Sequence, residues 1–169
     1  MFRLLLFISF LVTPFWSTEW DAKQVEPLVI VNKRINQLAY VENGSIQMVE
    51  QVATGKTQEL TPEGLFTITV KAKNPYYRRE NIPGGDPRNP LGTRWIGFDA
   101  KHTNGRIYGV HGTNDPSSIG KYISNGCIRM HKDSVEKLYD KVPIGTKILI
   151  TNTNESFQQL AKKYASNKR

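Results

Sequence analysis

A series of strand signals fills the first two thirds of this chain and limits its fold more than any other feature. Residues 28–31 (LVIV) form a continuous apolar run, which is typical of a strand buried on both faces. Residues 37–42 and 45–53 flank Asn43-Gly44, a dipeptide that readily adopts the two positive φ angles of a type I′ hairpin turn. The series therefore predicts a mainly β domain.

Two further strand regions enclose a long segment that has no strand signal. Apolar and polar residues alternate in 66–73, which predicts a strand with one buried and one solvated face. Residues 95–100 and 106–111 are expected to pair around a turn. The segment 74–92 between these regions has four prolines and three glycines, which predicts a surface loop. Loops of that length in a compact domain are usually functional.

Helical signals are confined to the C-terminal part of the chain. Asp133 and Glu136 have the spacing of a capping pair, so a short helix is expected to begin there and to end before Pro143. Residues 147–151 predict a final strand. The basic tail, residues 153–169, has apolar residues at helical spacing, and a helix docked on the sheet is favoured over one on a membrane surface. The fold class is mainly β with one or two short helices.

The N-terminus has the pattern of an export signal. Arg3 is followed by an apolar run from Leu4 to Trp16, which is shorter than the roughly 20 residues of a membrane span. No clean small-x-small cleavage site follows the run. Residues 1–20 are therefore interpreted as a signal peptide or a retained N-terminal membrane anchor, and a buried strand or helix is the alternative. We expect an exported protein, in the cell wall or on the extracytoplasmic face of the membrane.

Length and charge limit the class of partner. About 145 residues follow the signal, which is enough for one domain with its own core, and a monomer is expected. The formal net charge of +8 favours an anionic surface, such as phospholipid headgroups or cell-wall polymers. Nucleic acid is not expected as a partner, because the chain lacks an arginine-rich helix, zinc-ligand spacing and an aromatic RNA-binding signature.

The single cysteine lies in the segment SNGCIRM, residues 124–130. A free cysteine is often a small buried hydrophobic residue, and in an exported protein it can also form an intermolecular disulfide. The Ser-Asn-Gly turn before it, however, favours successive backbone N–H groups that face one way and attract an anion. Such an arrangement favours a thiolate and supplies oxyanion donors, which are the two requirements of acyl transfer. The turn composition therefore favours a reactive thiol.

A nucleophilic thiol needs a base, and the chain has three histidines. His111 ends a predicted strand, and Gly112 allows a sharp turn that leaves the imidazole facing a cleft. The Gly112 carbonyl could hold the second ring nitrogen and so set the tautomer. His131 is the second choice of base, and His102 is most simply a surface residue. A zinc site built from Cys127 and the histidines is not favoured, because the intervals lack closely spaced ligand pairs.

The residues around the cysteine resemble a known family. Residues 107–150 resemble the L,D-transpeptidase catalytic domain (YkuD-like) in their His-Gly-Thr motif, their Ser-x-Gly-Cys-Ile-Arg core and their Val-Pro-x-Gly-Thr segment. The segments VATGK (52–56), TPEGLFTI (61–68) and NPLGTRW (89–95) are similar too. The resemblance covers about residues 28–151 and implies a β-sandwich-like mixed β catalytic domain with a packed helix.

This resemblance implies an enzyme that acts on peptidoglycan stem peptides without a metal or an organic cofactor. The cysteine would cleave the bond between the diamino acid and the terminal D-alanine of a tetrapeptide stem. An amine of a second stem would then accept the acyl group and form a 3→3 cross-link. Carried onto this chain, Cys127 is the nucleophile, His111 is the base and later the acid, and Gly112 orients the ring.

The resemblance also implies roles for neighbours of the cysteine. The N–H groups of Asn125, Gly126 and Cys127 would be the oxyanion donors. Many members have histidine where Asn125 stands, so here His111 is expected to act as the only imidazole base. Loss of that histidine leaves open a catalytically impaired wall-binding module. An L,D-carboxypeptidase that gives the same acyl-enzyme to water is a second alternative, and a membrane-surface protein is a third.

Three further residues have weaker support as site residues. Arg129 would brace the turn or meet a carboxylate of the substrate. Tyr108 and Trp95 would line the cleft. Packing in the core is an equally good explanation of all three. Because the thiolate would add to a carbonyl beside the oxyanion donors, carbapenems are also expected to acylate Cys127 covalently.

Overall fold

The structure, a computed structural model, describes residues 26–166. The export signal expected in residues 1–20 lies outside the described residues. The strands are β1 (Leu28–Asn32), β2 (Gln37–Glu42), β3 (Ser45–Gln51), β4 (Thr54–Gly55), β5 (Gly64–Lys73), β6 (Arg94–Phe98), β7 (Tyr108–His111), β8 (Tyr122–Ser124), β9 (Ile128–Arg129) and β10 (Lys147–Thr151). The helices are α1 (Lys132–Lys141) and α2 (Phe157–Ser166), with 3-10 turns η1 (Ala100–His102) and η2 (Pro116–Ser118).

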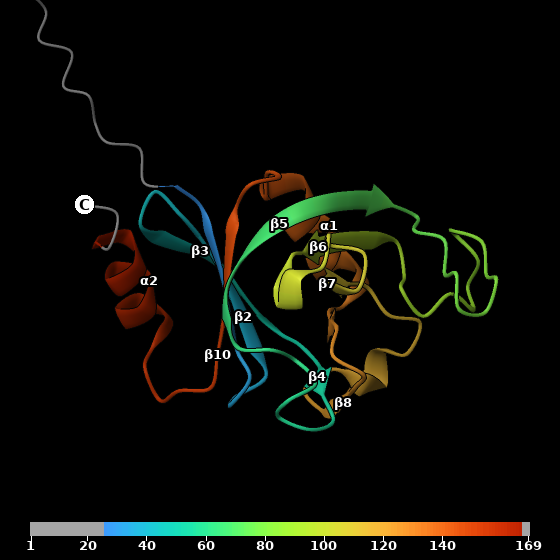
Figure 1. Cartoon of the computed structure of the whole chain (residues 1–169), viewed down its shortest axis with the longest axis horizontal. Coiled ribbons are helices and arrows are strands. Elements are labelled where there is room, and N and C mark those ends of the chain that lie inside the picture. Colours follow the sequence, from blue (N-terminus) through green and yellow to red (C-terminus); the bar gives the residue numbers. More distant parts are fainter. Residues whose placement is uncertain (1–25, 167–169) are drawn as a thin grey trace, which may run out of the picture.

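Eight of these strands form one curled sheet in the order β3-β2-β1-β10-β5-β6-β7-β9, and β4 pairs with β8 beside it (Figure 1). The sheet is mixed, because β1 runs parallel to β10 and β7 runs parallel to β9, while the other neighbours are antiparallel. The β2–β3 hairpin turns at Asn43 and Gly44, which have the predicted positive φ angles of 50° and 75°. The mainly β fold class is confirmed.

Strand β1 is buried on both faces, as its continuous apolar sequence predicts. Val29 and Val31 face a large apolar cluster that also contains residues of α1. Leu28 and Ile30 point the other way, into a smaller cluster with residues of α2. Because successive side chains of a strand point to opposite faces, a strand that separates two apolar layers needs an apolar residue at every position.

The alternation expected along residues 66–73 is only partly correct. Ile68 faces the large apolar cluster, but the pairing of β5 with β6 shifts between Ile68 and Val70. Beyond this bulge Lys71 lies opposite Ile96 and its Nζ donates to the Tyr139 and Val142 carbonyls at the end of α1, at 2.6 and 2.7 Å. An extra residue at a bulge exchanges the two faces of the strand that follows it. Val70 and Ala72 therefore line the cleft described below.

Helix α1 packs against β6, but its N-terminus differs from the predicted capping pair. The N-cap position is His131, and no side chain caps the helix there. The Glu136 carboxylate instead accepts the Thr93 hydroxyl at 2.7 Å and lies 3.5 Å from Arg94. The sequence pattern could not show these contacts of Glu136, because Thr93 and Arg94 lie about 40 residues earlier in the chain.

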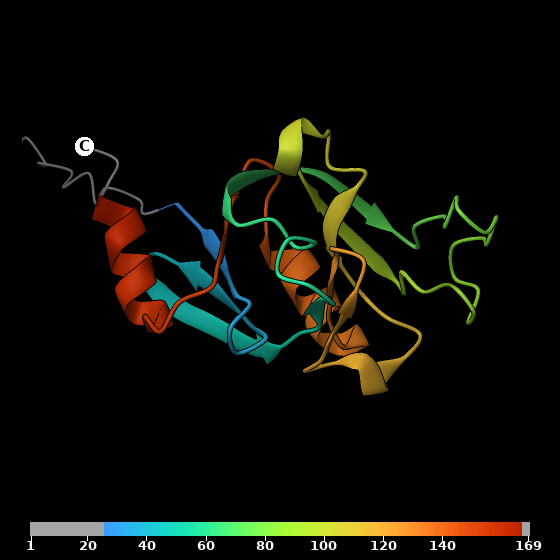
Figure 2. The same ribbon diagram turned by 60° about the horizontal axis from the view of Figure 1, so that its bottom comes forward.

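The tail helix α2 docks on β1 and β3 through Phe157, Leu160 and Ala161. None of the helices in residues 26–166 has the length and apolar character that a membrane crossing requires. The 74–92 segment is a long loop whose only pairing is an isolated bridge between Tyr77 and Ile82. This loop and α2 lie at opposite ends of the molecule (Figures 1 and 2).

Candidate active site

A cleft of about 780 Å³ lies over one face of β5, β6 and β7. The 74–92 loop forms one of its walls, and the turn of residues 124–127, called the nucleophile turn below, forms another. Cys127 and His111 both line this cleft, so the fold brings together the predicted nucleophile and the predicted base. His102 and His131 are exposed and do not line it.

Trp95 forms part of the floor of the cleft. Its ring stacks on His111 with centroids 5.6 Å apart, and its indole N–H donates to the Gly105 carbonyl at 2.9 Å. The ring lies across two glycines on paired strands, because a Cβ at Gly109 would be 2.7 Å from the ring and one at Gly97 would be 2.6 Å from its nitrogen. Side chains at these positions would displace the ring that covers His111.

His111 is 4% exposed and ends β7 opposite Trp95. Its Nδ1 lies 2.6 Å from the Gly112 carbonyl oxygen. A carbonyl can only accept, so this contact requires the proton on Nδ1 and leaves Nε2 as the basic nitrogen. Burial lowers the pKa of His111 to about 4, and the Arg129 charge acts in the same direction, while contacts with the Gly112 and Leu91 carbonyls oppose it. The imidazole is therefore neutral at pH 7.

The end of the 74–92 loop packs tightly against the turn that follows His111. Gly92 has a φ of +65°, and a Cβ there would lie 2.8 Å from the Gly112 Cα. Asn89 is buried and fastens the loop, since its Nδ2 donates to the Pro75 and Pro83 carbonyls at 2.8 and 3.1 Å. The loop wall is thus held in place directly beside the base.

Cys127 is only partly exposed and lies just before β9, which pairs with β7. Its Sγ lies 3.4 Å from the Ile107 carbonyl oxygen. Burial raises the pKa of the thiol to about 11, although the Gly109 N–H and the charges of Arg129 and Arg79 oppose this shift. The expectation that the turn favours a thiolate is therefore wrong, because the loss of hydration outweighs the nearby donors and cations. The pair rests as a neutral thiol and a neutral imidazole.

The nucleophile turn is held by several hydrogen bonds. The Ser124 hydroxyl accepts the Gly126 N–H at 3.0 Å and donates to the Cys127 carbonyl at 2.6 Å. Of the three predicted oxyanion donors, Gly126 is thus already engaged, whereas within residues 26–166 the N–H groups of Asn125 and Cys127 have no protein acceptor. Gly126 has a φ of +128°, and a Cβ there would lie 2.5 Å from the Leu60 carbonyl oxygen, so only glycine fits.

Positively charged side chains line the cleft. Arg129 lines the cleft together with Arg78, Arg79 and Arg106, and the cleft has no aspartate or glutamate among its described lining residues. Tyr108 reaches the cleft as well, but its ring also packs on Phe98 with centroids 6.3 Å apart. Tyr108 therefore both lines the cleft and packs against the core. In the described part of the chain, no three His, Cys, Asp or Glu side chains gather as metal ligands would.

The match to known proteins agrees with this geometry. A family model for the L,D-transpeptidase catalytic domain (YkuD) matches residues 26–150. The chain belongs to this L,D-transpeptidase family. The candidate L,D-transpeptidase YqjB of Bacillus subtilis is 56% identical over 154 residues, which cover 91% of this chain and 88% of that protein. The YkuD candidate of Bacillus licheniformis is 43% identical over 100 residues, which cover 59% of this chain and half of that protein.

Solved structures of L,D-transpeptidases share the fold. L,D-transpeptidase 3 of Mycobacterium tuberculosis, solved with a faropenem-derived adduct, superimposes with a TM-score of 0.60 at 18% identity, over 75% of this chain and 60% of that chain. The catalytic domain of the E. faecium enzyme gives a TM-score of 0.57 at 20% identity and covers 76% of this chain and 98% of that domain. The expectation of an L,D-transpeptidase enzyme with the fold of this family is confirmed.

Several residues that shape the L,D-transpeptidase site were not sequence candidates. Gly97 and Gly109 make room for Trp95, and the Thr61 hydroxyl bonds the Gly126 carbonyl at 3.0 Å. A glycine inside a strand often marks a place where another group approaches the backbone closely. This was the one local signal for Gly97 and Gly109. No local pattern of the sequence connects Thr61 with a turn that lies 65 residues further along the chain.

Proposed function

We propose that this protein is an exported L,D-transpeptidase in which Cys127 is the nucleophile and His111 is the general base. The observation that carries the proposal is the pairing in one cleft of the only cysteine of the chain with a buried histidine whose Nδ1 is held by a backbone carbonyl. A histidine held in this tautomer presents a basic Nε2, which is the requirement for deprotonating a thiol as it attacks a carbonyl.

The acylation step follows from these assignments. The thiol proton passes to His111 Nε2 while the sulfur bonds to the carbonyl carbon of the diamino acid, and the carbonyl electron pair moves onto the oxygen. The Cys127 and Asn125 N–H groups are the proposed donors to that oxyanion. When the adduct collapses, the C–N bond breaks and D-alanine leaves with the proton from the imidazolium. A thioester remains on Cys127.

The second step transfers the acyl group to an amine. An amine of a second stem attacks the thioester, His111 takes its proton, and the sulfur leaves and regains a proton as the thiol. The cross-link formed is of the 3→3 type. Because the pKa of the thiol is about 11 and that of the imidazole about 4, little free thiolate exists before the substrate binds. Proton transfer is therefore coupled to attack on the carbonyl.

The charge of the cleft supports an anionic peptide as substrate. Four arginines line the cleft, and they include Arg79, whose charge reaches the thiol, and Arg129. Arginine pairs readily with carboxylates through two parallel hydrogen bonds. Stem peptides carry carboxylates at the terminal D-alanine and along the stem, so peptidoglycan stems match this lining. Tyr76 and Tyr77 of the loop add apolar surface for the peptide.

Export completes the proposal, because peptidoglycan lies outside the membrane. The apolar N-terminal run supports a signal peptide or anchor in residues 1–20. The net charge of +8 supports attraction to anionic wall polymers. We propose a monomer that acts in the cell wall or on the extracytoplasmic face of the membrane.

The test is incubation of the full chain with disaccharide-tetrapeptide muropeptides, followed by mass analysis beside Cys127→Ala. A dimer that has lost one D-alanine, absent with the variant, is the expected product. A disaccharide-tripeptide alone would replace the transpeptidase with an L,D-carboxypeptidase. An unchanged substrate would overturn the proposal and leave a wall-binding module. As a second readout, intact-protein mass spectrometry should find a carbapenem adduct on the wild-type chain and none on Cys127→Ala.

A further inference from the structure

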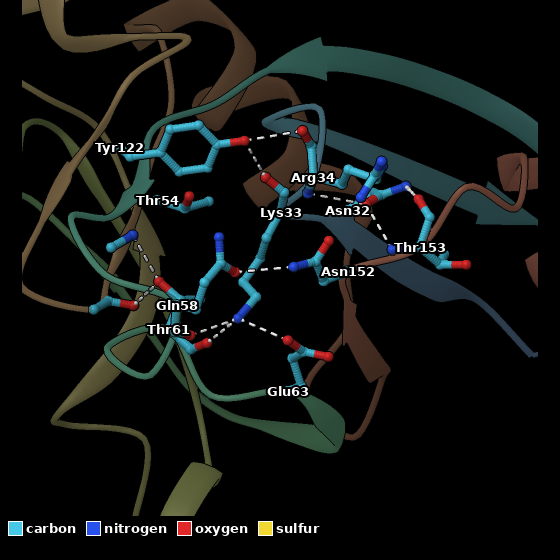
Figure 3. Close-up of polar contacts among 12 residues, drawn as sticks. Asn32, Lys33, Arg34, Thr54, Gln58, Thr61, Glu63, Tyr122, Asn152 and Thr153 are labelled. Atoms are coloured by element: carbon cyan, nitrogen blue, oxygen red, sulfur yellow. Dashed lines mark hydrogen bonds and ion pairs between the residues drawn. The ribbon is translucent and has the colours of Figure 1, made fainter.

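A buried lysine lies behind the nucleophile turn and is not part of the cleft. Lys33, which directly follows β1, is 2% exposed. Its Nζ donates to the Gln58 carbonyl at 2.7 Å and the Thr61 carbonyl at 2.9 Å, and it lies 3.0 Å from a carboxylate oxygen of Glu63 (Figure 3). Burying a cation is costly unless each of its donors has a partner. Three oxygens from one loop, residues 56–63, therefore hold this ammonium.

These contacts fasten the 56–63 loop to β1 and to the strand that leads into the nucleophile turn. The Lys33 N–H donates to the Thr151 carbonyl of β10 at 2.8 Å. The Tyr122 hydroxyl of β8 donates to the Lys33 carbonyl at 2.9 Å, as Figure 3 shows. The Lys56 N–H donates to the Ser124 carbonyl, also at 2.9 Å. The loop and β8 are thus anchored to the same point of the large sheet.

Thr61 connects this anchored loop to the turn. Its hydroxyl is fully buried, accepts the Gly55 N–H at 2.9 Å and donates to the Gly126 carbonyl oxygen at 3.0 Å. The Gly126 carbonyl and the Cys127 N–H belong to one planar trans peptide, so they point in opposite directions. Holding the oxygen on Thr61 therefore aims the Cys127 N–H away from Thr61, and that N–H has no acceptor within residues 26–166.

We propose that Lys33 and Thr61 are positioning residues that hold the Cys127 N–H in place as an oxyanion donor. The proposal rests on the proposed function, since an oxyanion forms only if Cys127 attacks a carbonyl. Neither residue lines the cleft, and both act through the backbone of the turn. A donor is effective only when it is aimed at the developing charge before the reaction begins. The buried cation stabilises the loop that carries Thr61 and so sets that aim.

The test compares two reactions of the same thiol. Acylation by a carbapenem creates an oxyanion, whereas alkylation by iodoacetamide needs the thiolate but forms no oxyanion. In the full chain, Thr61→Val should slow acylation by on the order of 10-fold to 100-fold, somewhat less than the loss of an entire oxyanion donor. Alkylation should change less than about threefold at the same pH, because the thiol keeps its burial and its neighbouring charges. Thr61→Ser keeps the hydroxyl and should restore most of the acylation rate.

Thr146→Val is the matched control. Thr146 is also buried, but its hydroxyl has no hydrogen-bond partner in the part of the chain that the structure describes. The same chemical change there should leave both rates as in the wild type. Glu63→Gln is the milder test of the Lys33 part, because Glu63 is half-exposed and the variant should keep the fold. It should lower the ratio of acylation to alkylation in the same direction, by about twofold to fivefold.

The outcomes separate the two proposals. A wild-type chain that iodoacetamide alkylates but no carbapenem acylates would overturn the proposed function and the positioning role together. If Thr61→Val is acylated as fast as the wild type, the positioning role alone is overturned. Equal losses of both reactions in Thr61→Val would indicate a general structural defect and would also overturn it. If Thr61→Val does not fold, an unchanged ratio in Glu63→Gln decides against the proposal.

Discussion

The two halves of the large sheet share one buried face but use the other face differently. In the β1, β2 and β10 half, α2 covers the outer face and packs on residues such as Ile30 and Leu149. In the β5, β6 and β7 half, the outer face carries the cleft with Trp95 and His111. Figure 1 shows α2 at one end and the 74–92 loop beside the cleft half at the other. Whether a sheet face becomes core or site thus depends on what covers it.

The side chains on the two outer faces differ accordingly. The covered face has medium-sized aliphatic residues, which pack closely under a helix. The cleft face instead combines the large Trp95 ring with Gly97 and Gly109 directly beneath it. The ring shields His111 on one side, and this burial is the cause of its lowered pKa. The cleft face therefore needs one large side chain beside glycines, whereas the face under α2 needs side chains of similar size.

The largest effect expected on the cleft face is the loss of the base. His111→Ala should lower kcat/KM for muropeptide dimer formation by about 10³-fold or more, since removing a general base costs about 10²-fold to 10⁴-fold and this chain offers no second imidazole in the described cleft. His102→Ala and His131→Ala, both exposed and outside the cleft, should stay within about twofold of the wild type. Product formation followed by mass analysis measures all three. A large loss in His131→Ala would assign the base to that residue instead.

The buried histidine should also make the stability of the cleft half depend on pH. In the unfolded chain His111 takes up a proton near pH 6.5, but in the folded chain it does so only near pH 4. Between these values the unfolded state binds more protons, so the free energy of unfolding falls as the pH falls. The loss at pH 4 should approach about 3 kcal/mol, because one pKa unit corresponds to about 1.36 kcal/mol.

Urea unfolding of the wild type and of His111→Gln at pH 7, 5.5 and 4.5 isolates this contribution, since the other titrating groups are common to both chains. The stability of the wild type should fall more steeply than that of the variant over this range. Parallel curves would mean that folding does not lower the pKa of His111. The effect of burial on this imidazole would then be wrong.

A cavity under α2 should affect stability without affecting chemistry. Leu160 is 2% exposed in the cluster beneath the helix. Leu160→Ala should lower the free energy of unfolding by about 2–4 kcal/mol, the usual cost of removing a buried leucine side chain. Well below the melting temperature, kcat/KM should stay within about twofold of the wild type, because α2 docks on β1 and β3 and has no residue among the described residues that line the cleft. A matching loss of activity would show that the two halves of the sheet are coupled.

The smallest effect concerns the charge of the cleft. Arg79→Gln should raise KM for muropeptides by about threefold to tenfold with little change in kcat, since Arg79 lines the cleft and its pairing with a carboxylate is worth about 1 kcal/mol near solvent. The wild-type KM should rise with salt, and this rise should be weaker in the variant. Arg34→Gln, an exposed arginine outside the cleft, is the control. Equal kinetics in all three chains would exclude recognition of anionic groups by Arg79.

Local sequence patterns determined much of the fold and part of the site. The Asn43-Gly44 turn and the final strand at 147–151 form where they were predicted, because a turn dipeptide and a strand period act on neighbouring residues. The motif around Cys127 and the His111-Gly112 pair identified the family and two residues that line the same cleft. The oxyanion and substrate roles stay predictions, since a short segment specifies which donors exist but not what they bind.

Contacts between distant segments decided the rest, because they depend on how the strands are aligned and on what covers them. The bulge after Ile68 turned Lys71 toward α1, although the alternating sequence predicted a solvated face. The burial that raises the pKa of Cys127 depends on the residues that the fold gathers around it, whereas the composition of its turn favoured a thiolate. Thr61 contacts Gly126 from a loop that Lys33, next to β1, holds in place. Burial and pairing of this kind are properties of the folded chain as a whole, and no short segment encodes them.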